Sequence, residues 1–341
     1  MGKMWFTNEL IDRLAMLQQT EAAHQGINQA AIEKDWWVTV TLKALFQTGC
    51  HNFLTFKGGT SLSKGFNIIE RFSEDIDLAI SHDFFGIEKT SKSQRDKLRK
   101  ASRRYVHETL STQLDARLKE MGISGYSIEN VNRVQDNDGN WQPIDSDKDP
   151  TVILLKYTSI VDNAIGYIRP QVKIELTSLS MDEPTEDRKI CSLIGECFVQ
   201  EDADTGCLVR TVVPTRTFLE KIFLLAEEFQ KAKPRSLRMS RHLYDLEKLM
   251  DTRYGREALA DQVLYKAIVE HRRTYYALKY VDYDCHKPGV INFMVPTKEM
   301  DAWRADYEAM RRFFIYGHSI EFDALINRIE ELQSRVRSIK D

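Results

Sequence analysis

The sequence lacks the features that would place this chain in a membrane or a secretory pathway. No apolar run in its 341 residues approaches the length of roughly 20 that a membrane-spanning helix needs. Residues 1–5 lack the apolar segment of a secretory signal. The cysteines number only five and show no Cys-x-x-Cys spacing, which supports neither a disulfide framework nor a zinc site. We therefore expect a cytoplasmic protein with no membrane partner.

The sequence also lacks a dominant charge. Its 48 Lys and Arg residues nearly balance 51 Asp and Glu residues, for a net charge of −3, so no general electrostatic coat for nucleic acid is expected. One segment is nonetheless basic, with Asp96 as its only acidic residue. Its basic members are Lys89, Lys92, Arg95, Lys97, Arg99, Lys100, Arg103 and Arg104. Such a stripe could hold an RNA backbone, or it could simply be the solvated face of a helix.

Hydrophobic periodicity predicts a mixture of helices and strands up to about residue 213. Apolar residues at helical spacing predict helices at 7–23, 28–48 and 93–121. Short apolar or alternating runs predict strands at 53–56, 74–80, 126–134, 150–158, 167–177 and 207–213. This part should therefore form a mixed sheet of about five or six strands with flanking helices.

From Pro214 onward the pattern is almost entirely helical. The expected helices are 215–231, 238–250, 259–280, 298–315 and 320–338. We therefore predict an α+β fold in which residues 1–213 form a catalytic domain and residues 214–341 a helical domain.

The segment 53–69 reads as strand, glycine turn and helix. The strand ends at Gly58 and Gly59, and Thr60 is the expected N-cap of a helix that points Leu62, Phe66 and Ile69 inward. The start of a helix after a glycine turn can offer backbone N–H groups to phosphate oxygens. Alone, such a turn is more often purely structural.

Two aspartates occupy the next predicted strand. Asp75 and Asp77 alternate with apolar residues, so both carboxylates fall on one face. Transfer of a nucleotide from a triphosphate requires the triphosphate to be held and its charge neutralised, which divalent cations bound by carboxylates do well. A pair of carboxylates at i and i+2 on a strand supplies such ligands. The glycine turn followed by this pair is far more specific than either feature alone.

These segments resemble a known family. Phe56-Lys57-Gly58-Gly59-Thr60-Ser61-Leu62-Ser63-Lys64, followed by Arg71-Phe72-Ser73-Glu74-Asp75-Ile76-Asp77-Leu78, is similar to the signature of the AbiEii/AbiGii-type nucleotidyltransferases. These are toxins of toxin–antitoxin and phage-defence systems within the DNA-polymerase-β-like superfamily. The segment 32–39 also resembles the family's N-terminal helix.

Later segments extend the resemblance. The run 172–176 resembles the second motif and offers Glu175 as a third carboxylate, which could complete a metal site or accept a proton. Lys221 lies in a segment like the third motif, whose lysine meets nucleotide phosphates. Arg241 and Asp245 lie one helical turn apart in a segment like the fourth. His242 stands where the family often has Asp, so we assign it no role.

The resemblance implies a magnesium-dependent enzyme with two bound Mg²⁺ ions and an NTP substrate. The implied metal ligands are Asp75, Asp77 and Glu175, and the implied catalytic residues are these three with Lys221 and Asp245. The implied nucleotide-binding residues are Gly58, Gly59, Thr60, Ser61, Lys64, Ser73, Lys221 and Arg241. Lys57 only precedes the glycine turn, so we expect it to point away from the nucleotide and to matter less than Lys221.

The sequence leaves the acceptor open. The leading hypothesis is transfer of a nucleoside monophosphate to a hydroxyl of RNA, such as a tRNA end, by a toxin that could have a cognate antitoxin. One alternative is a small-molecule acceptor, which would use the same active site. Another is a basic RNA- or protein-binding module that has kept the fold without catalysis, and magnesium-dependent NTP binding would distinguish it.

Overall fold

The computed structural model describes residues 3–24, 26–88, 91–135, 139–162, 168–181 and 184–339. The chain divides into two compact units. The first comprises Met1–Gly65 and Ser73–Thr211, and the second comprises Phe66–Phe72 and Val212–Asp341. The sequence alone suggested one change of domain, after residue 213. The structure adds Phe66–Phe72, here called the connector, to the second unit.

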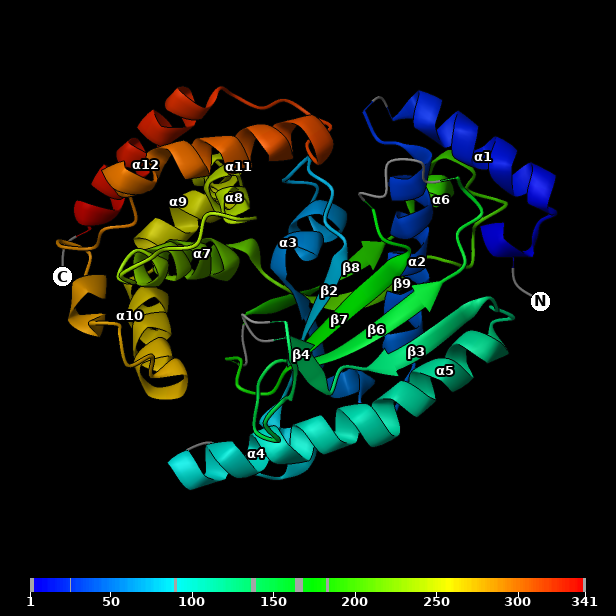
Figure 1. Cartoon of the computed structure of the whole chain (residues 1–341), viewed down its shortest axis with the longest axis horizontal. Helices are drawn as coiled ribbons and strands as arrows, with labels where there is room; N and C mark the ends of the chain where they lie inside the picture. Colours follow the sequence, from blue (N-terminus) through cyan, green and yellow to red (C-terminus); the bar gives the residue numbers. More distant parts are fainter. Residues whose placement is uncertain are drawn as a thin grey trace. The chain divides into compact units, whose positions relative to one another are not determined.

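The first unit is built on a mixed seven-stranded sheet in the order β3-β6-β7-β2-β1-β9-β8 (Figure 1). Its strands are β1 (Leu54–Lys57), β2 (Asp75–Ile80), β3 (Tyr126–Asn130), β6 (Thr151–Tyr157), β7 (Gln171–Thr177), β8 (Thr185–Ile190) and β9 (Cys207–Val212). Two further strands, β4 (Arg133–Gln135) and β5 (Trp141–Pro143), pair with each other in a separate two-stranded sheet. Strand β2 lies between β7, to which it is parallel, and β1, to which it is antiparallel.

Helices of the first unit come mainly from its N-terminal half. They are α1 (Leu10–Ala23), α2 (Gln29–Leu45), α3 (Gly58–Thr60), α4 (Lys92–Tyr105), α5 (Ser111–Glu120) and α6 (Leu193–Cys197). A π-helical turn, η3 (Ser61–Gly65), continues α3, and another, η5 (Val106–Leu110), joins α4 to α5. The predicted long helix at 93–121 is therefore confirmed.

One face of the sheet is covered by α2. Trp37 of α2 stacks on Tyr157 of β6 with ring centroids 4.8 Å apart. The strand register places Tyr157 on the same face as Ile174 of β7 and Ile76 of β2, which are buried. Because side chains alternate along a strand, the residues between these apolar positions point to the opposite face, and Asp75 and Asp77 are among them.

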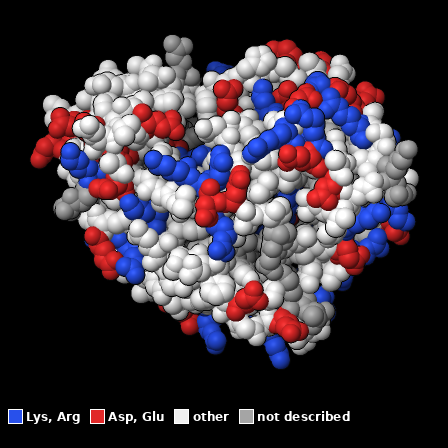
Figure 2. Space-filling model, turned by 180° about the vertical axis from the view of Figure 1, so that it is seen from behind, with Lys and Arg blue, Asp and Glu red and all other residues white. Residues whose placement is uncertain are grey.

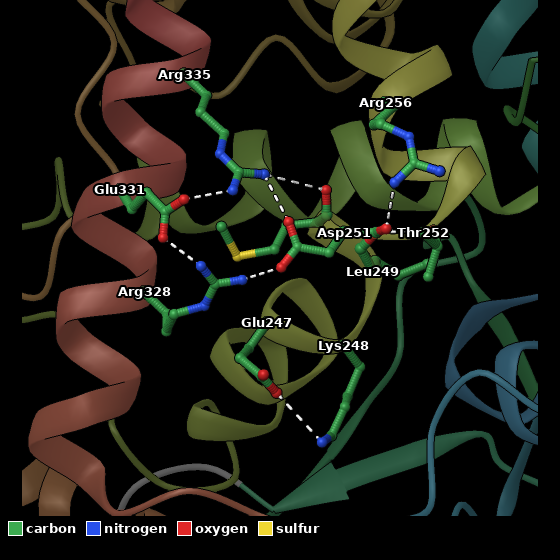
Figure 3. Close-up of polar contacts among 10 residues, drawn as sticks. Glu247, Lys248, Leu249, Asp251, Thr252, Arg256, Arg328, Glu331 and Arg335 are labelled. Atoms are coloured by element: carbon green, nitrogen blue, oxygen red, sulfur yellow. Dashed lines mark hydrogen bonds and ion pairs between the residues drawn. The ribbon is translucent and has the colours of Figure 1, made fainter.

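The second unit is helical. Its helices are α7 (Pro214–Glu228), α8 (Ser240–Met250), α9 (Arg253–Ala260), α10 (Gln262–His271), α11 (Met300–Phe313) and α12 (Phe322–Arg337). Figure 3 shows how α12 is tied to the end of α8: Asp251 accepts from Arg328 and Arg335, and both arginines also pair with Glu331. Among the described residues, no helix combines the length and the apolar character that crossing a bilayer requires.

The structure corrects several predicted elements. The helix after the glycine turn ends at Gly65 rather than near Ile69, and it begins at Gly58, so Thr60 is not its N-cap. Nothing in the sequence predicted β8, because its Thr-Glu-Asp-Arg-Lys-Ile run is almost wholly polar. The expected helix at 259–280 is instead divided between α9, α10 and a π-helical turn, η6 (Arg272–Tyr276).

Candidate active site

A row of charged side chains crosses three neighbouring strands on the face of the sheet opposite α2. Lys57 of β1 is the register partner of Asp77 of β2, and Asp77 in turn is the register partner of Glu175 of β7. Asp75 lies beside Lys173 in the same way. Since register partners share a face, the structure places the three predicted carboxylates on one face of the sheet, with two lysines beside them.

Lys57 is a correction to the sequence-based expectation. It does not point away from the site, because it lies directly across from Asp77. Its positive charge acts on the carboxyl groups of both Asp77 and Asp149 and favours a lower pKa at each. Lys57 therefore belongs to the charged row.

The carboxylates of the row repel one another. Burial and the neighbouring charge of Glu175 raise the pKa of Asp77 to about 7, against the opposing effect of Lys57. Glu175 itself forms an ion pair with Lys173. Concentrated negative charge of this kind is what a divalent cation neutralises.

Gly58 packs directly against the carboxylate of Asp77. Its φ is +82°, and a Cβ at this position would lie 2.0 Å from Asp77 Oδ2. Only glycine meets both the backbone conformation and the close approach. The glycine turn and the aspartate strand are thus one packed arrangement.

The hydroxyls after the glycines fasten this turn to β2. Thr60 Oγ1 donates to the backbone oxygen of Asp75 over 2.5 Å and lies 2.8 Å from Ser73 Oγ. Ser61 Oγ donates to the backbone oxygen of Gly58 over 2.8 Å. Thr60, Ser61 and Ser73 therefore hold the turn in shape, and backbone groups rather than these hydroxyls remain the better candidates for phosphate contacts.

Lys64 is engaged elsewhere. Its ammonium group pairs with Asp35 of α2, which also accepts from the backbone N–H of Leu193 over 2.8 Å. The preceding residue on α2, Lys34, pairs with Glu74 over 2.6 Å, directly before β2. Segment 32–39 thus braces the motif, and a nucleotide contact by Lys64 requires it to leave Asp35.

The second unit contains a buried cluster around Asp245 of α8. Its carboxylate accepts from Arg71 Nε over 2.7 Å, from Arg71 Nη2 over 2.8 Å, and it pairs with Lys221 Nζ over 2.8 Å. Burial opposes the ionised form, but the two cations hold the pKa of Asp245 well below its usual range. Burial lowers the pKa of Lys221, and Asp245 counteracts this.

Arg241 and His242 precede Asp245 on the same helix. Arg241 is half-buried, whereas His242 is buried and its Nδ1 has no hydrogen-bond partner among the residues that the structure describes. Burial, reinforced by Lys221 and Arg241, lowers the pKa of His242 well below its ordinary value. His242 therefore stays neutral at pH 7 and adds no charge to the cluster.

The charged row suits a metal ion whose remaining ligands are water molecules and substrate phosphates. Within the described part of the chain, no three acidic, imidazole or thiol groups converge closely enough to hold an ion by themselves. Mg²⁺ usually takes one or two protein carboxylates, with waters and substrate phosphates completing its octahedron. Asp75, Asp77 and Glu175 supply oxygen donors of this kind, so the residues fit Mg²⁺ bound together with a nucleotide.

Not all members of the basic stripe between Lys89 and Arg104 lie free on the surface of α4. Lys89 lies outside the described residues, Arg99 pairs with Asp96 over 3.0 Å, and Arg103 is buried against Val131 and Asn132. The exposed remainder includes Lys97, Lys100 and Arg104. Their spacing of three and four residues places them on one side of α4, and we call them the α4 basic face.

Sequence reasoning missed two further residues. Lys173 lies inside the run 172–176 but was given no role, and its ion pair with Glu175 gives it a place in the row. Arg71 stood inside the recognised motif without a role, and its buried pairing with Asp245 joins positions 174 residues apart. No local pattern signals a contact at that separation.

Comparisons with known proteins bear on the family and the fold of this chain. Residues 41–328 match the family described as nucleotidyl transferase AbiEii toxin, type IV TA system. A search of curated proteins found no match. Among solved structures, MenT4, a nucleotidyltransferase toxin from Mycobacterium tuberculosis H37Rv, is similar with a TM-score of 0.52 and 14% sequence identity, over 95% of this chain and 90% of that one. At this identity the likeness concerns the fold.

Proposed function

The chain belongs to the AbiEii family of nucleotidyltransferase toxins, and we propose that it uses Mg²⁺ to transfer a nucleoside monophosphate from an NTP to a hydroxyl of RNA. In this reaction the acceptor oxygen forms a bond to the α-phosphorus, the bond between the α- and β-phosphates breaks, and pyrophosphate leaves. The proton of the acceptor hydroxyl passes to a base.

The observation that carries the proposal is the row of Asp75, Asp77 and Glu175 beside the glycine turn. Two adjacent strands hold the carboxylates on one face, and Asp77 lies over Gly58, where the backbone can be approached closely. When bound, Mg²⁺ would neutralise the triphosphate and polarise its α-phosphate. Asp75 and Asp77 are the proposed ligands, and Glu175 is either a third ligand or the proton acceptor.

The remaining residues have proposed roles in binding the nucleotide. The backbone N–H groups around Gly58, Gly59 and Ser61 would receive phosphate oxygens, and Lys221 would meet the triphosphate. Since Lys221 is bound by Asp245 in this structure, Asp245 supports the lysine rather than the metal. Arg241, one turn before Asp245, would also contact the nucleotide.

For the acceptor, we propose RNA held by its phosphates. The α4 basic face is the supporting feature, because Lys97, Lys100 and Arg104 are exposed and lie on one side of a helix. A cognate antitoxin would belong to the same system, as the family's description implies. The cytoplasm is the proposed compartment, where NTP and RNA are both present.

The test is direct transfer. The protein is incubated with each of the four α-labelled NTPs, Mg²⁺ and total RNA, and labelled RNA is separated on a denaturing gel. We expect one NTP to label RNA, and we expect EDTA or the substitution Asp77→Asn to abolish the label. If the protein binds NTP with Mg²⁺ but never labels RNA, the acceptor is a small molecule instead. If it binds no NTP, the catalytic proposal is wrong.

A further inference from the structure

The connector joins the two halves of the motif but packs in the other unit. It begins at Phe66, directly after the π-helical turn η3, and ends at Phe72, three residues before the start of β2. Arg71 forms a β-bridge with Ile315, and the backbone N–H of Phe72 donates to the oxygen of Phe314 over 2.7 Å. Residues of the helical unit therefore hydrogen-bond to the backbone of the connector just before β2.

The residue before Arg71 is held as closely. The backbone oxygen of Glu70 accepts from the N–H of Tyr316 over 3.0 Å, and its backbone N–H donates to Tyr244 Oη over 3.3 Å. A Cβ on Gly317 would lie 2.1 Å from Glu70 Oε2 and 2.4 Å from Glu70 Cβ. Tyr244, Tyr316 and Gly317 thus form a close-fitting binding site for the end of the connector.

Asp245 contacts both Arg71 of the connector and Lys221. The same carboxylate takes two hydrogen bonds from Arg71 and one ion pair from Lys221, and all three side chains are buried. A phosphate bound by Lys221 would compete with Asp245 for the ammonium group. The position of Lys221 and the position of Arg71 in the connector therefore both depend on the carboxylate of Asp245.

We propose that Arg71 is a positioning residue of the transfer reaction. Through Asp245 it sets the position of Lys221, and through the connector it couples nucleotide binding at Lys221 to the strand that carries Asp75 and Asp77. The inference rests on the proposed function, because it needs Lys221 to bind the nucleotide. Arg71 itself touches no reacting atom.

The structure offers a matched control for this idea. Arg272 is also a buried arginine of the second unit, and it binds Glu227 through two hydrogen bonds of 2.7 and 2.5 Å. It does not belong to the connector or to the Asp245 cluster. Arg71→Lys and Arg272→Lys both keep the charge and lose the forked geometry, so they remove equivalent contacts at different places.

The experiment compares the dissociation constant of NTP with Mg²⁺, and kcat, for both variants, after circular dichroism has shown them folded. We expect Arg71→Lys to weaken NTP binding about tenfold and Arg272→Lys to change it by less than about twofold. Gly317→Ala, which shifts the connector without removing a charge, should weaken binding in the same direction. It provides a second readout if Arg71→Lys folds poorly.

A double-mutant cycle separates positioning from general loss of structure. In a Lys221→Ala background, Arg71→Lys should weaken NTP binding by less than about twofold, because the group it positions is gone. Full additivity, equal effects of the two arginine variants, or a wild-type constant for Gly317→Ala would overturn the inference while the proposed function stands. A wild-type protein that binds no NTP would instead sink the proposed function, and the inference with it.

Discussion

The carboxyl group of Asp77 lies where its negative charge is unfavourable. Burial and Glu175 raise its pKa to about 7, whereas in an unfolded chain it would titrate near its ordinary value. A group whose pKa is raised by folding stabilises the native state fully only below its unfolded pKa, and that contribution is lost as the pH rises through the folded pKa. At pH 8 without metal, the ionised Asp77 therefore destabilises the fold.

This predicts opposite effects of Asp77→Asn on stability and on activity. The variant should lose transfer activity, yet its free energy of unfolding at pH 8 in EDTA should exceed that of the wild type by roughly 1–3 kcal/mol, with a smaller gain at pH 5. Urea titrations at the two pH values measure the difference. The exposed neighbour Asp83, changed to Asn, should show no such gain. A destabilised Asp77→Asn at pH 8 would contradict the electrostatic account.

Among the elements, the glycine turn joins backbone conformation to chemistry. Gly58 and Gly86 both have positive φ, of +82° and +60°. Among the described residues, a Cβ on Gly58 would meet Asp77, whereas nothing lies within 4 Å of a Cβ on Gly86. The two positions therefore separate backbone strain from displacement of Asp77.

Both substitutions by alanine should cost about 1–2 kcal/mol of stability through strain at positive φ. Gly58→Ala should in addition abolish transfer, because its Cβ pushes the Asp77 carboxylate aside, whereas Gly86→Ala should keep activity near the wild-type rate. Unfolding titrations and transfer assays on both proteins check this. Activity retained by Gly58→Ala would show that the contact with Asp77 is dispensable.

A second element, α4, allows a test of whether the proposed RNA acceptor binds through its phosphates. Changing Lys97, Lys100 and Arg104 together to Glu should reduce RNA labelling at least about tenfold and leave NTP binding unchanged, because phosphate contacts are lost and the charged row is not. The control reverses three exposed basic residues of the same unit, Arg117, Lys119 and Lys156, each of which pairs with an acidic residue. Equal effects of both triple variants would remove any special role from α4.

The sequence predicted those parts of the site that depend on local pattern. Alternation put Asp75 and Asp77 on one face, and the glycine pair marked the turn. The orientation of Lys57 was wrong because it depends on the pairing of β1 with β2, which the motif does not state. The sequence left the connector with its neighbours along the chain, and its place in the second unit depends on partners, such as Asp245, that are distant in sequence. Strand β8 was missed because its edge position needs no apolar run.

At the scale of the whole molecule, net charge limits how the proposed RNA acceptor would be bound. The chain carries a net charge of −3, and basic and acidic side chains are interspersed on the face drawn in Figure 2. A net charge of this sign offers the proposed RNA acceptor no general attraction, so its binding would come from a local set of cations such as the α4 basic face.

Local binding predicts a shallow dependence on salt. Three phosphate contacts with a single strand should give a slope of about −2 in a plot of log affinity against log salt concentration. Filter binding of RNA between about 50 and 200 mM salt measures this slope for the wild type and for the triple variant of α4. A slope steeper than about −6 would mean that a far larger basic surface is involved.

The central claim is that the carboxylate row catalyses nucleotidyl transfer, and counting both products tests it most directly. The protein is given Mg²⁺, RNA and the active NTP, labelled at the α-phosphate in one reaction and at the γ-phosphate in another. We predict that α-label enters RNA in a one-to-one ratio with γ-labelled pyrophosphate, and that Asp77→Asn gives neither product. Transfer of γ-label to RNA, or undiminished products from Asp77→Asn, would contradict the account.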